Sequence, residues 1–155
     1  GIWSRDPLTG VIEVAVVIYE RGDEMDHWST LVDPEVQVSD FISNLTGITS
    51  EAIDATGVTR DIARHELQER LKDADLVVAH NMDFDRHGLA WLGVHVPEAN
   101  RFCTMVNLVP DSEKWPRLSE ALAHFGLEQI GTPHRAETDA RSAGRIFLDM
   151  VRRGW

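Results

Sequence analysis

Residues 11–19 read Val-Ile-Glu-Val-Ala-Val-Val-Ile-Tyr, and this stretch decides the fold class. It is apolar and mostly β-branched, and Glu13 is the one charged residue within it. A strand with one solvent-exposed face alternates apolar and polar residues, whereas a strand covered on both faces is apolar throughout. The stretch therefore predicts an interior strand of a sheet that is covered on both faces.

The residues that follow predict a hairpin. Residues 21–24, Arg-Gly-Asp-Glu, have the composition of a turn, and residues 27–32 read as the partner strand. The Asp33-Pro34 dipeptide ends that strand, because proline cannot continue a ladder and favours a turn. We expect two neighbouring antiparallel strands from this part of the chain.

Beyond the hairpin, strand and helix patterns alternate. A short apolar strand is expected over residues 75–79, and residues 39–57 hold short helical pieces. Thr49 and Thr59 are of the residue type that caps helix N-termini. Longer helices are expected over residues 59–72, 82–92, 117–125 and from 135 onward. Together these elements predict an α/β fold with a mixed sheet flanked by helices.

Length and composition fit one soluble domain. The chain has 155 residues, of which 43% are hydrophobic, and this length suits one domain better than two. Its one cysteine, Cys103, cannot form an internal disulfide, which suits a reducing compartment. No stretch has the length of a membrane span. We therefore expect a cytoplasmic location without membrane attachment.

The charge balance limits how the chain meets nucleic acid. It has 15 Lys and Arg against 26 Asp and Glu, a net charge of −11. This balance argues against a broad basic face that holds phosphates directly. It remains compatible with contact through divalent cations, which offset the charge of the carboxylates around them.

Two short stretches carry residue types suited to catalysis. Residues 79–85 read AHNMDFD and follow the expected strand, at the sheet edge where α/β proteins bind ligands. Residues 134–139 read HRAETD and open the last helix. Taken singly, Asp85 and Asp139 are equally typical of carboxylates that favour a helix N-terminus, and His134 is typical of a surface histidine.

Taken together, the two stretches resemble a known family. AHNMDFD resembles the second motif of the DEDDh 3′–5′ exonucleases, AHNxxFD, and HRAETD resembles their third motif, HRAxxD. Residues 11–15 (VIEVA), 45–49 (LTGIT) and 103–105 (CTM) also resemble family stretches, in the family's order and spacing. The resemblance spans nearly the whole chain. It implies that residues 1–155 form a single exonuclease domain with a ribonuclease H-like, mixed five-stranded sheet flanked by helices.

The resemblance also implies roles for five residues. Asp85 and Asp139 match metal ligands for two Mg²⁺ or Mn²⁺ ions, and His134 matches the general base that deprotonates the attacking water. Asn81 matches a residue that supports the site and touches the terminal nucleotide. Ile48 matches a position near the last base, with simple loop packing as an open alternative. Carboxylates suit hard cations that clamp the oxygens of a phosphoryl transfer, and histidine suits proton transfer near neutral pH.

One family motif has no match. The first strand of the family carries Asp-x-Glu, and the nearest stretch here, residues 6–10, has Leu8 in place of the Glu and Pro7 in a strand position. We therefore expect the first strand to be absent from this chain, with Gly1 as the last glycine of that motif and residues 2–10 as a loop. We further expect the natural protein to carry Asp-x-Glu before Gly1, and residues 1–155 alone to bind metals weakly and be inactive.

The implied activity is removal of nucleoside monophosphates from single-stranded 3′ ends. DNA is favoured over RNA through the resemblance to proofreading exonucleases. The expected partners are the 3′ end itself and a polymerase or another replication or repair protein. The alternative is a catalytically inactive exonuclease-like domain that serves as a nucleic-acid-binding or scaffold module.

Overall fold

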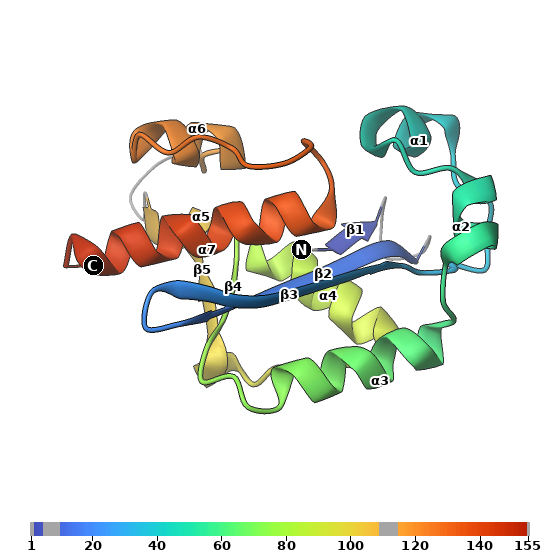
Figure 1. Ribbon diagram of the computed structural model, residues 1–155, viewed down its shortest axis with the longest axis horizontal. Coiled ribbons are helices and arrows are strands. Elements are labelled where there is room, and N and C mark those ends of the chain that lie inside the picture. The colour runs from blue at the N-terminus through green and yellow to red at the C-terminus, as the bar shows by residue number, and fades with distance from the viewer. Residues whose placement is uncertain (1, 5–9, 109–114, 155) are drawn as a thin grey trace.

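The computed structural model describes residues 2–4, 10–108 and 115–154, and Figure 1 shows its elements. The strands are β1 (Ile2–Ser4), β2 (Val11–Glu20), β3 (Asp23–Leu31), β4 (Val77–Ala79) and β5 (Arg101–Cys103). The helices are α1 (Asp40–Thr46), α2 (Ser50–Thr56), α3 (Arg60–Leu71), α4 (Met82–Leu92), α5 (Thr104–Leu108), α6 (Leu118–His124) and α7 (Ala136–Arg152), with a 3₁₀ turn at Glu98–Asn100.

The predicted hairpin is confirmed. β2 and β3 pair antiparallel from Glu13 opposite Leu31 to Glu20 opposite Asp23. The turn between them places Arg21 and Gly22 at φ 54° and 88°. Positive φ at both central residues is the turn geometry whose twist matches that of paired strands. The pairing therefore starts closer to the turn than expected, and β3 begins at Asp23.

The prediction that residues 2–10 form a loop was wrong for its first part. Ile2–Ser4 forms β1, which pairs antiparallel with β2 through Ile2 opposite Val14 and Trp3 opposite Glu13. Without a neighbour on the side away from β3, β2 would leave a row of N–H and C=O groups unpaired. The extended segment β1 pairs with these groups. Residues 5–9, the rest of the predicted loop, lie outside the described residues.

The described strands do not form the single mixed, five-stranded sheet that was predicted. β1, β2 and β3 form one antiparallel sheet, and β4 and β5 pair in parallel as a second, from Val77 opposite Arg101 to Ala79 opposite Cys103. The described strands thus lie in sheets of three and two. The α/β class is confirmed.

Two short-range predictions about the helices also hold. The side chain of Thr49 accepts a hydrogen bond from the Ala52 amide at 3.1 Å, and that of Thr59 accepts one from the Ile62 amide at 3.3 Å. These bonds satisfy donors that a helix N-terminus leaves unpaired. β5 leads directly into α5, so that residues 103–105, the CTM stretch, span the end of a strand and the start of a helix.

β2 is covered on both faces, as its apolar sequence predicts. Figure 1 shows α7 on one side of the β2–β3 hairpin and α3 and α4 on the other. Val11 and Val14 of β2 belong to a core cluster shared with α3 and α4, including Leu67 and Leu92, while Ile12 belongs to a second cluster beside α1 and α2. Full burial of each such side chain stabilises the fold by roughly 1.5–3 kcal/mol.

Within the described residues, no helix is both long and apolar enough to cross a bilayer.

A close contact fixes the start of β2 against α4. Gly10 has φ 78°, and a Cβ added to it would lie 2.7 Å from Cζ2 of Trp91. The guanidinium of Arg60 also lies over the Trp91 ring, with its Cζ 3.7 Å from the ring centroid. Glycine is therefore required at position 10 both for its backbone conformation and for the space that the indole occupies.

We predict that Gly10→Ala destabilises the protein by about 2–4 kcal/mol, since it adds a steric clash to a strained left-handed backbone. Gly22→Ala is the matched control, because Gly22 has φ 88° but an added Cβ meets nothing within 4 Å. The control is expected to lose only about 1 kcal/mol. Urea unfolding measures both, and equal losses would show that the Trp91 contact contributes nothing.

Candidate active site

The start of α7 brings two of the predicted site residues together. His134 is exposed, precedes the helix and has φ 61°, in the left-handed region that non-glycine residues rarely adopt. Asp139 lies in the first turn of α7, and its amide donates to the carbonyl of Arg135 at 3.0 Å. The charge of His134 acts on the Asp139 carboxyl, so the two side chains share one electrostatic environment.

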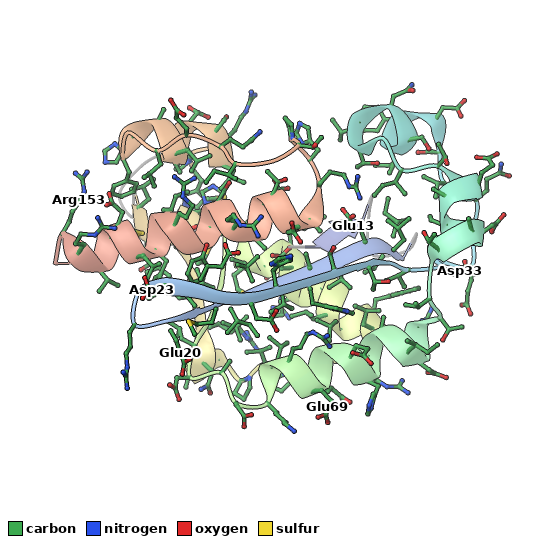
Figure 2. All side chains as sticks on the ribbon, in the orientation of Figure 1. Glu13, Glu20, Asp23, Asp33, Glu69 and Arg153 are labelled. Carbon is green, nitrogen blue, oxygen red and sulfur yellow. The ribbon has the colours of Figure 1, made fainter. Side chains whose placement is uncertain are left out.

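A buried carboxylate from β2 holds this helix start in place, as Figure 2 shows for Glu13. Glu13 is only 3% exposed. The guanidinium of Arg135 donates to it through Nε at 3.1 Å to both oxygens and through Nη2 at 2.6 Å to Oε2. The amide of Ala136 donates to Oε1 at 2.8 Å. Glu13 therefore binds Arg135 and Ala136, which lie 122 and 123 positions later in the chain.

The sequence analysis missed this pair. The available signal was Glu13 itself, the lone charge in an apolar strand, because a buried carboxylate needs a cationic or hydrogen-bonding partner. The sequence does not say which of the 15 Lys and Arg residues supplies it. Arg135, inside the HRAETD stretch, is the partner.

The carboxyl of Asp139 has a strongly perturbed pKa. Burial is the main reason that this pKa is raised to about 6; the charge of His134 opposes the rise and the negative charge of Glu13 adds to it. Near neutral pH the ionised form of Asp139 is thus maintained against a desolvation cost. A cation next to this carboxylate would relieve that cost. Strongly perturbed pKa values of this kind are common at functional sites.

The second stretch lies where β4 runs into α4. Asn81 joins them with φ 67°, and its carbonyl accepts from the amides of Phe84 at 3.1 Å and Asp85 at 3.4 Å. Asp85 sits half-buried in the first turn of α4. Asn81 is exposed, and its side chain makes no capping hydrogen bond. Both stretches thus pair a left-handed residue with an acidic first turn.

His80 ties neighbouring elements to the end of β4. Its Nε2 donates to the carbonyl of Pro116 at 2.8 Å, which leaves Nδ1 to accept from the hydroxyl of Thr104 at 2.9 Å. Burial lowers the pKa of His80, in keeping with a neutral ring. His80 therefore supports the segment that carries Asn81 and Asp85.

Ile48 lies in the loop between α1 and α2, as predicted. Its side chain is 2% exposed and packs with Ile12, Ile42 and Ile53. Its amide donates to the hydroxyl of Thr46 at 3.1 Å. This environment is that of loop packing, one of the two alternatives for this position.

The acidic first turns of α4 and α7 both belong to helices that pack on β2. Asp85 and Asp139 supply the hard oxygen donors that divalent cations prefer. Within residues 2–4, 10–108 and 115–154, however, no three His, Cys, Asp or Glu side chains gather closely enough to hold a metal ion. Asp85 and Asp139 could therefore supply part of a cation's ligand set.

Comparisons with known proteins identify the family of the chain. A family model described as the RNase T exonuclease family matches residues 6–147. The 3′–5′ exonuclease DinG of Bacillus subtilis is 28% identical over 147 residues, which cover 91% of this chain and 16% of DinG. The PolC-type DNA polymerase III of Lacticaseibacillus paracasei is 27% identical over 149 residues, covering 90% of this chain and 10% of the polymerase.

The fold has counterparts among solved structures. A 3′-exonuclease solved for its 3′-end-specific recognition of the histone mRNA stem-loop superposes with a TM-score of 0.74 at 22% identity, covering 94% of this chain and 73% of that one. The chain spans only about a sixth or less of the curated relatives DinG and PolC. Because the family model covers most of its length, the chain belongs to the RNase T exonuclease family.

Proposed function

We propose that this protein is a two-metal 3′–5′ exonuclease that releases nucleoside monophosphates from single-stranded 3′ ends. The observation that carries the proposal is the start of α7, where His134 and the carboxyl of Asp139, whose pKa is raised to about 6, lie together. A proton acceptor beside a buried carboxylate is the arrangement that metal-assisted hydrolysis requires.

Each residue has a proposed role. His134, exposed on its loop, accepts the proton of the attacking water. Asp85 and Asp139 would contribute ligands to two Mg²⁺ or Mn²⁺ ions, which would supply positive charge beside the scissile phosphate and lower the pKa of a bound water. Asn81 supports the site and contacts the terminal nucleotide. Ile48 lies near the last base, although its burial supports packing more than contact.

We propose DNA as the favoured substrate. The support is the match to PolC, whose name is that of a DNA polymerase, while the histone mRNA exonuclease keeps RNA as the competing substrate. The same match supports association with a polymerase or another replication or repair protein. We further propose a cytoplasmic location and a single exonuclease domain over residues 1–155. The net charge of −11 favours contact at the strand's end over contact along its length.

The second candidate is an inactive exonuclease-like domain that binds nucleic acid or serves as a scaffold. It is favoured by the absence, within the described residues, of a three-ligand metal cluster. The two candidates differ in one assay on the full-length protein, with a 5′-labelled single strand and Mg²⁺ or Mn²⁺. An exonuclease gives a ladder that shortens by single nucleotides, and a binding module retards the strand without shortening it.

We predict that Asp85→Asn and Asp139→Asn each reduce exonuclease activity at least about 100-fold, because an amide is a poor ligand for a hard cation. The measurement is the rate of ladder formation on DNA and RNA strands of the same sequence. Asp54→Asn, at an exposed position in α2, is the control and is expected to retain activity. Unchanged activity in the Asp139 variant would exclude the assigned site.

We predict that His134→Asn lowers the rate about 10²–10⁴-fold, the usual contribution of a general base. His95→Asn, at an exposed position after α4, is the matched control. The measurement is the rate of ladder formation for both variants on the same labelled strand. A His134 variant that keeps the wild-type rate would show that another group acts as the base.

We predict a pH-dependent stability gain for Asp139→Asn in the metal-free protein. The pKa of Asp139 is about 6 in the folded chain, above its ordinary value of 3.8, so the folded state holds the proton more tightly. Stability is therefore lost as the pH rises through this interval, by about 3 kcal/mol at most.

The asparagine variant is expected to match the wild type near pH 3.5 and to exceed it in unfolding free energy at pH 8, by roughly 1–3 kcal/mol. Urea unfolding at both pH values measures this. A variant that is less stable than the wild type at pH 8 would contradict the raised pKa.

A further inference from the structure

Helix α7 is fastened to the β2–β3 hairpin by two carboxylates. Glu13 of β2 binds Arg135 and the Ala136 amide at the start of the helix. Glu24 of β3 accepts from Arg141 Nε at 2.7 Å and Nη2 at 3.1 Å, farther along the same helix. The Glu13 contacts, called here the Glu13 clamp, lie next to His134. The Glu24 contacts lie beyond the first turn of α7.

The Glu13 clamp uses its carboxylate fully. Its oxygens take two guanidinium donors and one amide that begins a helix, and the side chain is 4% exposed. Removing a charge from water is costly unless such partners are in place, so any displacement of α7 along β2 carries a large penalty. The bidentate fork of Arg135 also fixes orientation, which a point charge would leave free.

The loop that carries His134 is fastened at its other end as well. Gly131 has φ 112°, and a Cβ added to it would overlap Oγ1 of Thr138, a buried residue in the first turn of α7. Residues 131–134 therefore fold back onto the turn that contains Asp139. His134 lies between this contact and the Glu13–Arg135 pair, in a left-handed conformation that only surrounding structure can maintain.

We propose that Glu13 is a positioning residue of the active site: through Arg135 and the Ala136 amide it fixes the orientation of His134 relative to Asp139. Glu13 touches neither substrate nor metal in this account. Its effect reaches the chemistry through the backbone that it holds, and catalysis is sensitive to such placement because small displacements of a reacting group slow the reaction strongly.

The proposal rests on the proposed exonuclease function for its kinetic arm, but its structural arm is independent. Glu13→Gln is nearly isosteric and removes the charge and one acceptor oxygen, so it cannot satisfy all of the donors of Arg135 and Ala136. Glu24→Gln is the matched control, because Glu24 of β3 makes the other carboxylate contact to α7, through Arg141. Both are studied in the full-length protein, at a temperature where circular dichroism shows each variant folded.

The first readout is kinetic. Glu13→Gln is expected to lower kcat at least about tenfold with KM changed less than about threefold, since the lost contact orients a catalytic group and does not bind substrate. Glu24→Gln is expected to keep kcat within about twofold. Equal losses of kcat in both variants would reduce the Glu13 effect to helix stability and overturn the proposal.

The second readout is NMR and needs no activity. Glu13→Gln is expected to shift the His134 ring resonances and to speed amide exchange at residues 136–139 at least about tenfold, while Glu24→Gln leaves the His134 ring unchanged. Unchanged His134 resonances in Glu13→Gln would overturn the proposal. If the wild type proves inactive, the exonuclease function fails, and these resonances alone decide whether the clamp positions His134.

Arg135→Lys covers the case in which Glu13→Gln does not fold. It keeps the charge and the Ala136 bond to Glu13 but loses the two-pronged geometry. It is expected to shift the His134 ring in the same way as the glutamine variant, with a smaller loss of kcat. A folded Arg135→Lys protein with wild-type resonances and kcat would contradict the proposal.

Discussion

The bidentate pair between Glu13 and Arg135 is the interaction on which the candidate site depends. It places a charge inside an apolar strand, where charge is costly, and satisfies that charge with the start of the last helix. Strand β2 and the start of helix α7 are thereby held in a fixed position relative to each other. Because His134 precedes this contact and Asp139 follows it within one turn, the same bond that stabilises the fold also sets the site.

The site shows signs that it lowers the stability of the fold. His134 and Asn81 both adopt left-handed backbone conformations, which cost energy for residues with a Cβ. Asp139 is buried beside the negative charge of Glu13, and its pKa rises to about 6. Sites that bind cations often hold their carboxylates in this unfavourable state until the cation arrives. The accumulation of such features at residues 81 and 134–139 is more readily explained by function than by folding.

The sequence predicted what local patterns determine. Apolar runs, caps and turn residues correctly indicated the hairpin, the Thr49 and Thr59 caps and helix α4 (Met82–Leu92), because each depends on neighbours within a few positions. The motif match gave the family. The pairing of Ile2–Ser4 with β2, the partner of Glu13 and the pKa of Asp139 depend on contacts between distant segments or on burial, which no local pattern specifies. The roles assigned to the five site residues remain predictions.

The central claim is that Asp139, held by the Glu13-anchored helix, is a cation ligand. It is tested most directly by ¹³C NMR titration of the Asp139 carboxyl in the full-length protein, with and without Mg²⁺. The account predicts a pKa of about 6 without metal and a clear decrease when Mg²⁺ is added, because the cation stabilises the ionised form. A pKa near the ordinary value of 3.8, or one that Mg²⁺ leaves unchanged, would contradict it.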